Sequence, residues 1–269
     1  MNRVKGIQRL SLFIAVLVLA MLSCQGVGGF NPFATKTPTP TATFTPSPTL
    51  TPSPTASSTP THTPTSTPLP TGIKTEEQSD GSTLFIDYDN KYQLVLPEEW
   101  VVVPISRSAI SRTADEMAKE NPKLADALEA FKDLDPDIFR GIALYTNEEY
   151  LYKGYATNIS ISAFEDETMS SLPLPFVTGI LEESLKANGA KILTNGVNEL
   201  DNAHNVEIEY IDMEQSLRFS GTTLVIHSRI LVFQPNGILV MVQLATPKQF
   251  SKDVFPIADA VGGTIEILE

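Results

Sequence analysis

Cysteine is almost absent from this chain of 269 residues, because Cys24 is the only one. No disulfide can therefore form within one copy, and a folded part must depend on its hydrophobic core. The sequence also lacks common catalytic motifs: it contains no Gly-x-Ser-x-Gly, no Gly-x-Gly-x-x-Gly, no phosphate-binding glycine-rich loop and no His-Glu-x-x-His. These absences argue against the enzyme classes that use those motifs.

Acidic residues outnumber basic residues in this chain. Lys and Arg total 19, Asp and Glu total 32, and the formal net charge is -13. Residues 1–72 contain no Asp or Glu, so all the acidic residues lie beyond them. Such an acidic surface repels polyanions and anionic lipid headgroups. We therefore expect no nucleic acid partner and a folded domain that stands away from the lipid surface.

Long apolar runs are missing except near the start of the chain. Three basic residues, Arg3, Lys5 and Arg9, precede an apolar run over residues 10–22. This run is shorter than the roughly 20 residues that a membrane-spanning helix needs. A basic segment followed by a short apolar segment is typical of a signal peptide, which we assign to residues 1–23.

The sequence Met-Leu-Ser-Cys at residues 21–24 resembles the bacterial lipobox, in which the Cys is acylated and becomes the mature N-terminus. Ordinary cleavage beside an incidental Cys24 is the alternative. Lipidation would also remove a single exposed thiol, which is a liability in a secreted protein. We predict that residues 24–30 form a lipidated N-terminus and that acylated Cys24 holds the protein in the bilayer of the cell membrane, facing the extracytoplasmic side.

Thr-Pro and Ser-Pro pairs dominate residues 31–72. This segment has almost no charge and few large apolar side chains, so it cannot form a core. Proline biases the backbone to extended polyproline II. We predict a disordered Thr/Pro-rich linker here, followed by one globular domain over residues 73–269.

Short strands and helices alternate in the pattern of residues 73–269. We expect strands over residues 84–88, 92–96, 100–103, 139–145, 156–164, 191–200, 206–213, 224–233, 238–245 and 264–268. We expect helices over residues 108–119, from 122 to about 134 after the cap Asn121, and over residues 173–187 and 248–261. The Asn236-Gly237 pair supplies the positive φ values of a tight hairpin turn. Consecutive hairpins flanked by helices predict an α+β domain with an antiparallel sheet.

Several of these segments together resemble the PsbP-like superfamily. The resemblance is carried by Tyr-Gln-Leu-Val-Leu-Pro-Glu-Glu-Trp at residues 92–100, the helix over 173–187, the hairpin through Asn236-Gly237 and the terminal helix and strand over 250–267. That superfamily includes the photosystem II extrinsic subunit P, a small Ran-binding nuclear import factor and many bacterial lipoproteins. The resemblance implies an α/β/α sandwich, with helices covering an antiparallel sheet, and a non-enzymatic binding or assembly role.

Few side chains suggest a chemical site. His204 and His227 each stand alone in the sequence, and such a histidine is usually structural or solvated. Asp133, Asp135 and Asp137 have the spacing of the first ligands of an EF-hand loop, but Ile138 and Leu144 stand where the loop needs Gly and Glu. We therefore expect a solvated turn there and an acidic loop at residues 165–167. No metal and no cofactor is predicted.

The helical stretch over residues 106–135 is long for a connection inside a compact domain, and such connections are often functional. Its charged outer face is our predicted surface for an envelope protein partner, made by Glu116, Lys119, Lys123, Asp126 and Glu129. The alternative is that Leu124 and Leu128 pack on the sheet and the stretch is ordinary cover.

Three function classes remain. The first is a non-catalytic binding or assembly module of the cell envelope. The second is a carrier of a small apolar ligand, which requires a cavity between the sheet and the helices. The third is a hydrolase whose site combines His227 with an acidic residue distant in sequence, which requires a buried pair facing a cleft.

Overall fold

The computed structural model describes residues 70–268, except residues 130, 167, 168, 170, 195–198 and 220 and the side chain of Arg107. The expected signal peptide, Cys24 and nearly all of the expected linker lie outside these residues. Among the helices that are described, none has the length and apolarity to span a membrane.

Strands and helices alternate along the described chain. The strands are β1 (Ile73–Glu77), β2 (Thr83–Asp87), β3 (Tyr92–Leu96), β4 (Trp100–Pro104), β5 (Phe139–Tyr145), β6 (Leu151–Tyr152), β7 (Tyr155–Ala156), β8 (Asn158–Phe164), β9 (Lys191–Ile192), β10 (Glu209–Phe219), β11 (Thr222–Phe233), β12 (Leu239–Pro247) and β13 (Glu266–Ile267). The α-helices are α2 (Arg107–Met117), α3 (Pro122–Glu129), α5 (Leu174–Ala187) and α6 (Ser251–Gly263). Short 3₁₀ helices are η1 (Glu148–Tyr150), η2 (Pro235–Gly237) and η3 (Lys248–Phe250).

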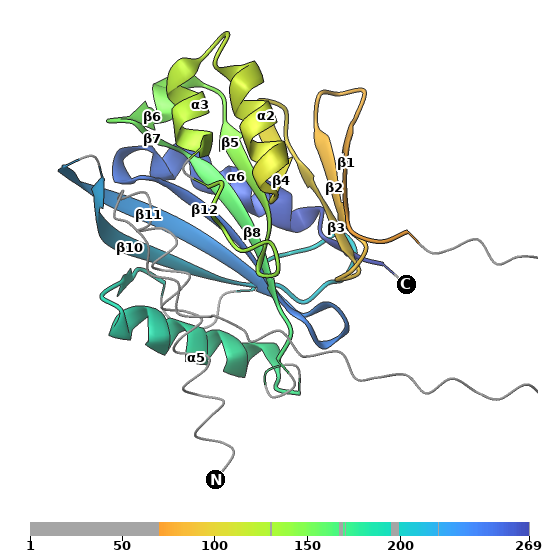
Figure 1. Ribbon diagram of the computed structural model, residues 1–269. Coiled ribbons are helices and arrows are strands. Elements are labelled where there is room, and N and C mark those ends of the chain that lie inside the picture. The colour runs from red at the N-terminus through yellow and green to blue at the C-terminus, as the bar shows by residue number, and fades with distance from the viewer. Residues whose placement is uncertain are drawn as a thin grey trace, which may run out of the picture. The chain divides into compact units, whose positions relative to one another are not determined.

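Two sheets contain most of these strands (Figure 1). The larger has seven strands in the order β4-β5-β8-β12-β11-β10-β9, and the smaller has four in the order β1-β2-β3-β13. Neighbouring strands pair antiparallel in both sheets. The expected α+β class with an antiparallel sheet is therefore confirmed.

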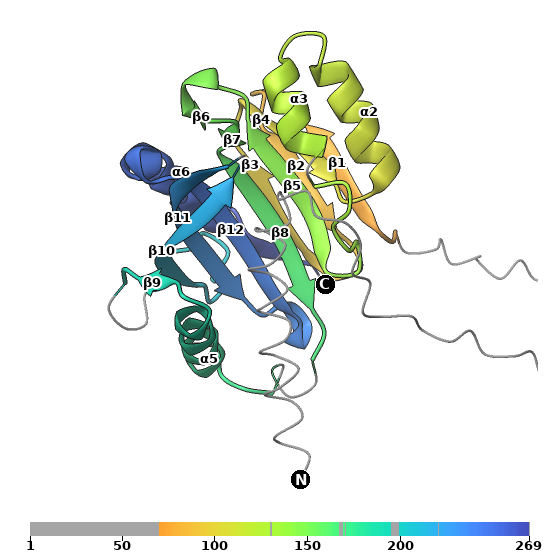
Figure 2. The ribbon, with the colours of Figure 1, turned by 60° about the vertical axis from the view of Figure 1, so that its left-hand side comes forward.

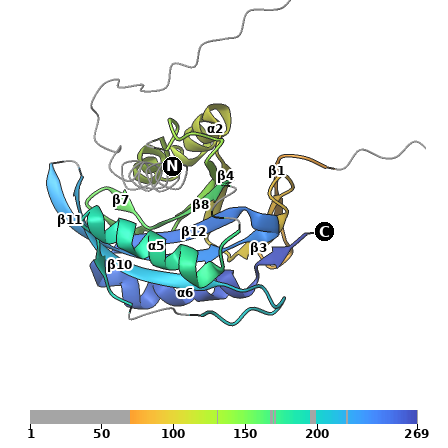
Figure 3. The same cartoon turned by 90° about the horizontal axis from the view of Figure 1, so that it is seen from below.

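Helices cover both faces of the seven-stranded sheet. Helices α2, α3 and α5 lie on one face, and α6 lies on the other beside the four-stranded sheet (Figures 2 and 3). Two apolar clusters fill the space on either side of the sheet. One joins the buried side chains of α2, α3 and α5 to the sheet, and the other joins α6 and the four-stranded sheet to its opposite face. This is the expected α/β/α sandwich, with the small sheet sharing one outer layer.

Local signals in the sequence explain several element boundaries. The Asn121 side chain accepts a hydrogen bond from the Leu124 amide at 3.1 Å, so it caps α3 as predicted. The predicted hairpin turn is confirmed at Asn236 and Gly237, which have φ values of 49° and 81°. Leu124 and Leu128 are buried against the sheet, so α2 and α3 form part of its cover.

Some predicted boundaries were wrong. Of the strand expected over residues 191–200, only the two residues of β9 form a strand within the described part; Glu199 makes an isolated bridge with Glu209, and residues 195–198 lie outside that part. The strand expected over 206–213 begins later and extends to Phe219, because β10 continues its pairing with β11 to the end of a long hairpin. The last α-helix begins at Ser251 after a 3₁₀ turn, and the helix from Pro122 ends at Glu129. Hydrogen bonding to distant segments decided the ends of the strands.

Candidate functional site

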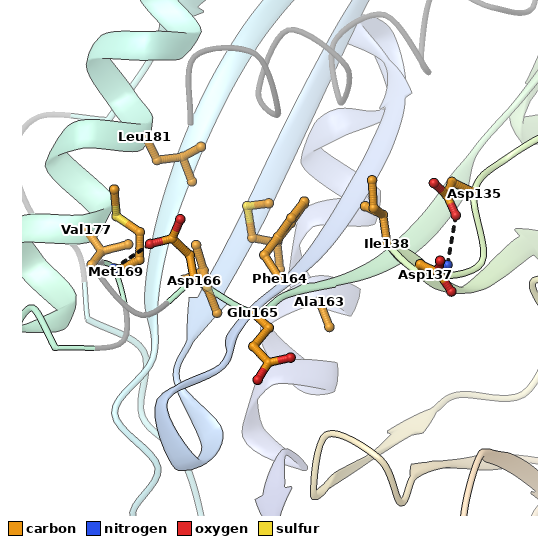
Figure 4. A pocket seen from close by; sticks show the side chains of 12 residues that line it. Asp135, Asp137, Ile138, Ala163, Phe164, Glu165, Asp166, Met169, Val177 and Leu181 are labelled. Atoms are coloured by element: carbon orange, nitrogen blue, oxygen red, sulfur yellow. Dashed lines mark hydrogen bonds between the residues drawn. The ribbon is translucent and has the colours of Figure 1, made fainter. Parts of the chain in front are cut away.

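A pocket of about 340 Å³ lies between α5 and the seven-stranded sheet. It is bounded by the ends of β8 and β12, the inner side of α5 and the turn that precedes β5 (Figure 4). Ligand pockets commonly have volumes of ~300–1,000 Å³, so this pocket lies at the lower end of that range.

Apolar side chains form most of the pocket wall, namely Ile138, Ala163, Phe164, Met169, Val177, Leu181, Leu239 and Met241. Val177 and Leu181 stand one helical turn apart on α5, and both are nearly buried. Two methionines add unbranched, polarisable side chains that adapt to different shapes. The wall is therefore suited to an apolar ligand or to the apolar part of a larger one.

Carboxylates complete the lining. Asp135 and Asp137 lie at one end of the pocket, and Asp166 lies at the other with Glu165 near the middle (Figure 4). The Asp137 amide donates to Asp135 Oδ1 at 3.0 Å, and the Met169 amide donates to Asp166 Oδ1 at 3.0 Å. These bonds fix the Asp135 and Asp166 side chains by closing short turns of the backbone.

Sheet topology brings the two acidic segments together. Strands β5 and β8 are antiparallel neighbours, so the segment before Phe139 meets the segment after Phe164 at the same end of the sheet. Strand β12 begins there too, because Leu239 pairs with Phe164. The sequence indicated both acidic segments separately as solvated loops. It did not show that they border one apolar pocket, because strand pairing over this distance is not visible in local patterns.

A second hollow of about 430 Å³ is more polar. Its lining comprises Leu174, His204, Asn205, Val206, Glu207, Gln234, Glu266 and Ile267. The balance of polar and apolar groups there resembles ordinary surface. The pocket beneath α5 is therefore the better candidate site, although the second hollow is larger.

The predicted partner surface lies on and between α2 and α3. Glu116, Lys119, Lys123 and Asp126 are exposed, as an interaction surface requires. Glu129 is half-buried and pairs with Lys132 at 2.9 Å; this hydrogen bond lowers the pKa of Glu129. None of these five predicted residues lines the pocket beneath α5.

The hydrolase hypothesis placed His227 beside an acidic residue, and the structure does so. His227 Nε2 lies 3.0 Å from Glu214 Oε2, and its Nδ1 lies 3.1 Å from Ser251 Oγ. The Ser251 hydroxyl, however, donates to the Lys248 carbonyl oxygen at 2.9 Å. Hydrogen bonds from Lys248 and His227 lower the pKa of Glu214 to about 2. Neither pocket described above is lined by these residues. Their contacts join β10 and β11 to η3 and α6.

A metal site needs several ligating side chains that converge on one point. Within the described part of the chain, no group of three or more His, Cys, Asp or Glu side chains is arranged to hold a metal ion. Asp135 and Asp137 belong to an exposed turn, as expected from the failed EF-hand pattern.

No protein-family model matches the chain, and no curated protein matches its sequence. The fold is similar to the solution structure of cyanobacterial PsbP (CyanoP) from Synechocystis sp. PCC 6803, with a TM-score of 0.44, 14% identity, and coverage of 71% of this chain and 94% of that one. It is also similar to LpqN, a Mycobacterium tuberculosis protein involved in cell envelope biogenesis, with a TM-score of 0.40, 11% identity, and coverage of 73% and 91%. Both likenesses concern the fold alone.

Proposed function

We propose that this chain is a lipid-anchored, extracytoplasmic binding module whose folded domain is not catalytic and holds the apolar part of a ligand beneath α5. The observation that carries this proposal is the pocket of about 340 Å³, with its wall of buried and half-buried aliphatic, aromatic and thioether side chains. A carrier of an apolar ligand requires such a cavity between sheet and helices.

Val177 offers a direct test of the pocket. It is 2% exposed and lines the pocket from α5, so Val177→Phe adds a ring where the ligand would lie. We expect binding of the neutral fluorophore N-phenyl-1-naphthylamine to weaken at least tenfold. Val225→Phe is the matched control, because Val225 is 38% exposed on β11 and lines neither pocket.

Overpacking costs about 1–3 kcal/mol, so thermal unfolding of Val177→Phe must be measured beside binding. A second readout uses the unchanged protein, in which a diazirine-bearing apolar probe should label Met169 or Met241. Labelling spread over residues outside the pocket, together with equal fluorophore binding by both variants, would remove the proposed site.

The anchor is tested separately. Acylated Cys24 should make the mature protein partition into detergent, and Cys24→Ala should abolish this partition because no acyl chain can be attached. A Cys24→Ala protein that is processed and retained like the wild type contradicts the lipid anchor without affecting the pocket.

A further inference from the structure

The pocket beneath α5 has a lining of one charge sign. Among the described residues, twelve line the pocket, of which four are acidic and none is Lys, Arg or His. An apolar site for a fatty acid or another anionic lipid would need at least one basic group or hydrogen-bond donor for the headgroup. The charged side chains of this lining offer only acceptors.

We infer that the ligand of this pocket is a cationic amphiphile, with an apolar body against α5 and the sheet and a positively charged end at the carboxylates. This inference rests on the proposed function, since it names the class of ligand for the same site. It adds the charge of the ligand, which the apolar wall alone does not determine.

Electrostatics makes the assignment selective. Asp135, Asp137 and Glu165 are exposed, and Asp166 is half-buried, so their charges lie at the water-facing ends and edge of the pocket rather than in the apolar interior. A positive headgroup at either end keeps its contact with water and gains attraction from the carboxylate or carboxylates at that end. An anionic headgroup in the same place meets repulsion from all of them. The net charge of -13 of the whole chain adds to both effects.

Three probes with the same decyl chain separate the contribution of the apolar wall to binding from the contribution of the carboxylate charges. Decylammonium, decanol and decyl sulfate are titrated into the full chain below their micelle concentrations, with calorimetric detection. We expect decylammonium to bind about tenfold more tightly than decanol at low salt, and decyl sulfate to bind most weakly. Because surface charges are screened, addition of about 0.5 M NaCl should remove most of the advantage of decylammonium.

A variant that neutralises three of the four carboxylates locates the effect. Asp135→Asn, Asp137→Asn and Asp166→Asn are combined, because Asn has the shape of Asp and keeps, at positions 135 and 166, the acceptor oxygen that the local backbone turns use. We expect this variant to lose most of the advantage of decylammonium over decanol. The matched control combines Asp115→Asn, Asp201→Asn and Asp253→Asn, three exposed carboxylates that do not line the pocket. This control removes the same number of charges and should still bind decylammonium more tightly than decanol.

The outcomes separate this inference from the proposed function. Equal binding of decylammonium and decanol, with Val177→Phe weakening both, overturns the cationic ligand and leaves the apolar site intact. Tighter binding of decyl sulfate, or an equal loss in both triple variants, also overturns it. Binding of all three probes that Val177→Phe does not change removes the site itself, and with it the proposed function.

Discussion

The two faces of the seven-stranded sheet are covered in different ways. On one face, α6 and the four-stranded sheet enclose large, fully buried side chains such as Phe85, Tyr92 and Phe233. The rings of Tyr92 and Phe233 meet edge to face with centroids 5.5 Å apart. On the other face, α5 packs on β10 and β11 but leaves the pocket of about 340 Å³ beside β8 and β12.

Charged groups differ between the faces as well. Beneath α6, Arg229 lies between Asp212 at 2.7 Å and Asp259 at 2.5 Å, with the rings of Tyr210 and Phe255 on its guanidinium. Burial opposes its charge, but the two carboxylates raise the pKa of Arg229 above its ordinary value. On the α5 face, by contrast, the buried carboxylate oxygens of Glu209 have no hydrogen-bond partner within the described residues. The ion pairs of Arg229 therefore strengthen one face, whereas the other retains space and an unpaired carboxylate.

The largest loss of stability is expected from a substitution in the core between the two sheets. Phe85 has an exposed fraction of 0%, so Phe85→Ala should lower the free energy of unfolding by about 3–5 kcal/mol. Phe176→Ala is the matched control, because Phe176 is 58% exposed on α5 and should change stability by less than about 0.5 kcal/mol. Urea denaturation measures both. Equal losses in the two variants would show that the α6 face has no special part in stability.

A smaller loss of stability is expected when the ion pairs between Arg229 and its two carboxylate partners are removed. Arg229→Met leaves Asp212 and Asp259 without their shared cation, which should cost about 2–3 kcal/mol because the site is partly open to water. Amide exchange in α6 should accelerate more than exchange in α5. Arg112→Met, at an exposed position of α2, serves as the control. Uniform acceleration across all helices would contradict a local attachment.

Glu209, on the face covered by α5, predicts that the stability of the domain depends on pH. Burial raises the pKa of Glu209, and the neighbouring Thr178 hydroxyl donates to the Leu174 carbonyl oxygen at 3.0 Å. In the folded state, Glu209 therefore keeps its proton up to a higher pH than in the unfolded chain, where Glu titrates near 4.5. The contribution of Glu209 to stability is greatest below that pH and is lost as the pH rises through the folded pKa.

Glu209→Gln should accordingly match the wild type near pH 4 and exceed it near pH 8, because the amide stays neutral at both. Urea denaturation at both values measures the difference, with the exposed Glu120→Gln as control. A stability difference between wild type and Glu209→Gln that is the same at both pH values would show that burial does not shift the titration of Glu209.

The smallest effect on stability is expected at the predicted partner surface. Lys119 and Lys123 are exposed, so Lys119→Glu with Lys123→Glu should change the free energy of unfolding by less than about 0.5 kcal/mol. Capture of an envelope protein partner by cross-linking should nevertheless fall if α2 and α3 form its surface. The control reverses Lys153 and Lys252, which are also exposed. Unchanged capture of an identified partner removes Lys119 and Lys123 from the interface.

Local patterns predicted most elements of the domain because they depend on neighbouring residues. The Asn121-Pro122 cap, the alternation through Ile159, Ile161 and Ala163, and the Asn236-Gly237 turn all act within a few residues. Prediction failed where the end of a strand depends on a distant strand. Strand β10 reaches Phe219 because Thr222 pairs with it across the hairpin, and β9 has two residues because these are the ones that pair with Met213 and Glu214.

Sequence by itself determined the α+β class, the order of most strands and helices, the acidic charge and the expectation of a lipid anchor at Cys24; it did not indicate β1 or the β6–β7 hairpin. These properties follow from composition, periodicity and short motifs. Only the tertiary structure decided that the acidic segments around Asp135 and Asp166 share a pocket with Val177 and Met241. It also decided that His227 meets Glu214 and Ser251. Such contacts depend on which strands pair and which face each helix covers, and these are set by the packing of the whole domain.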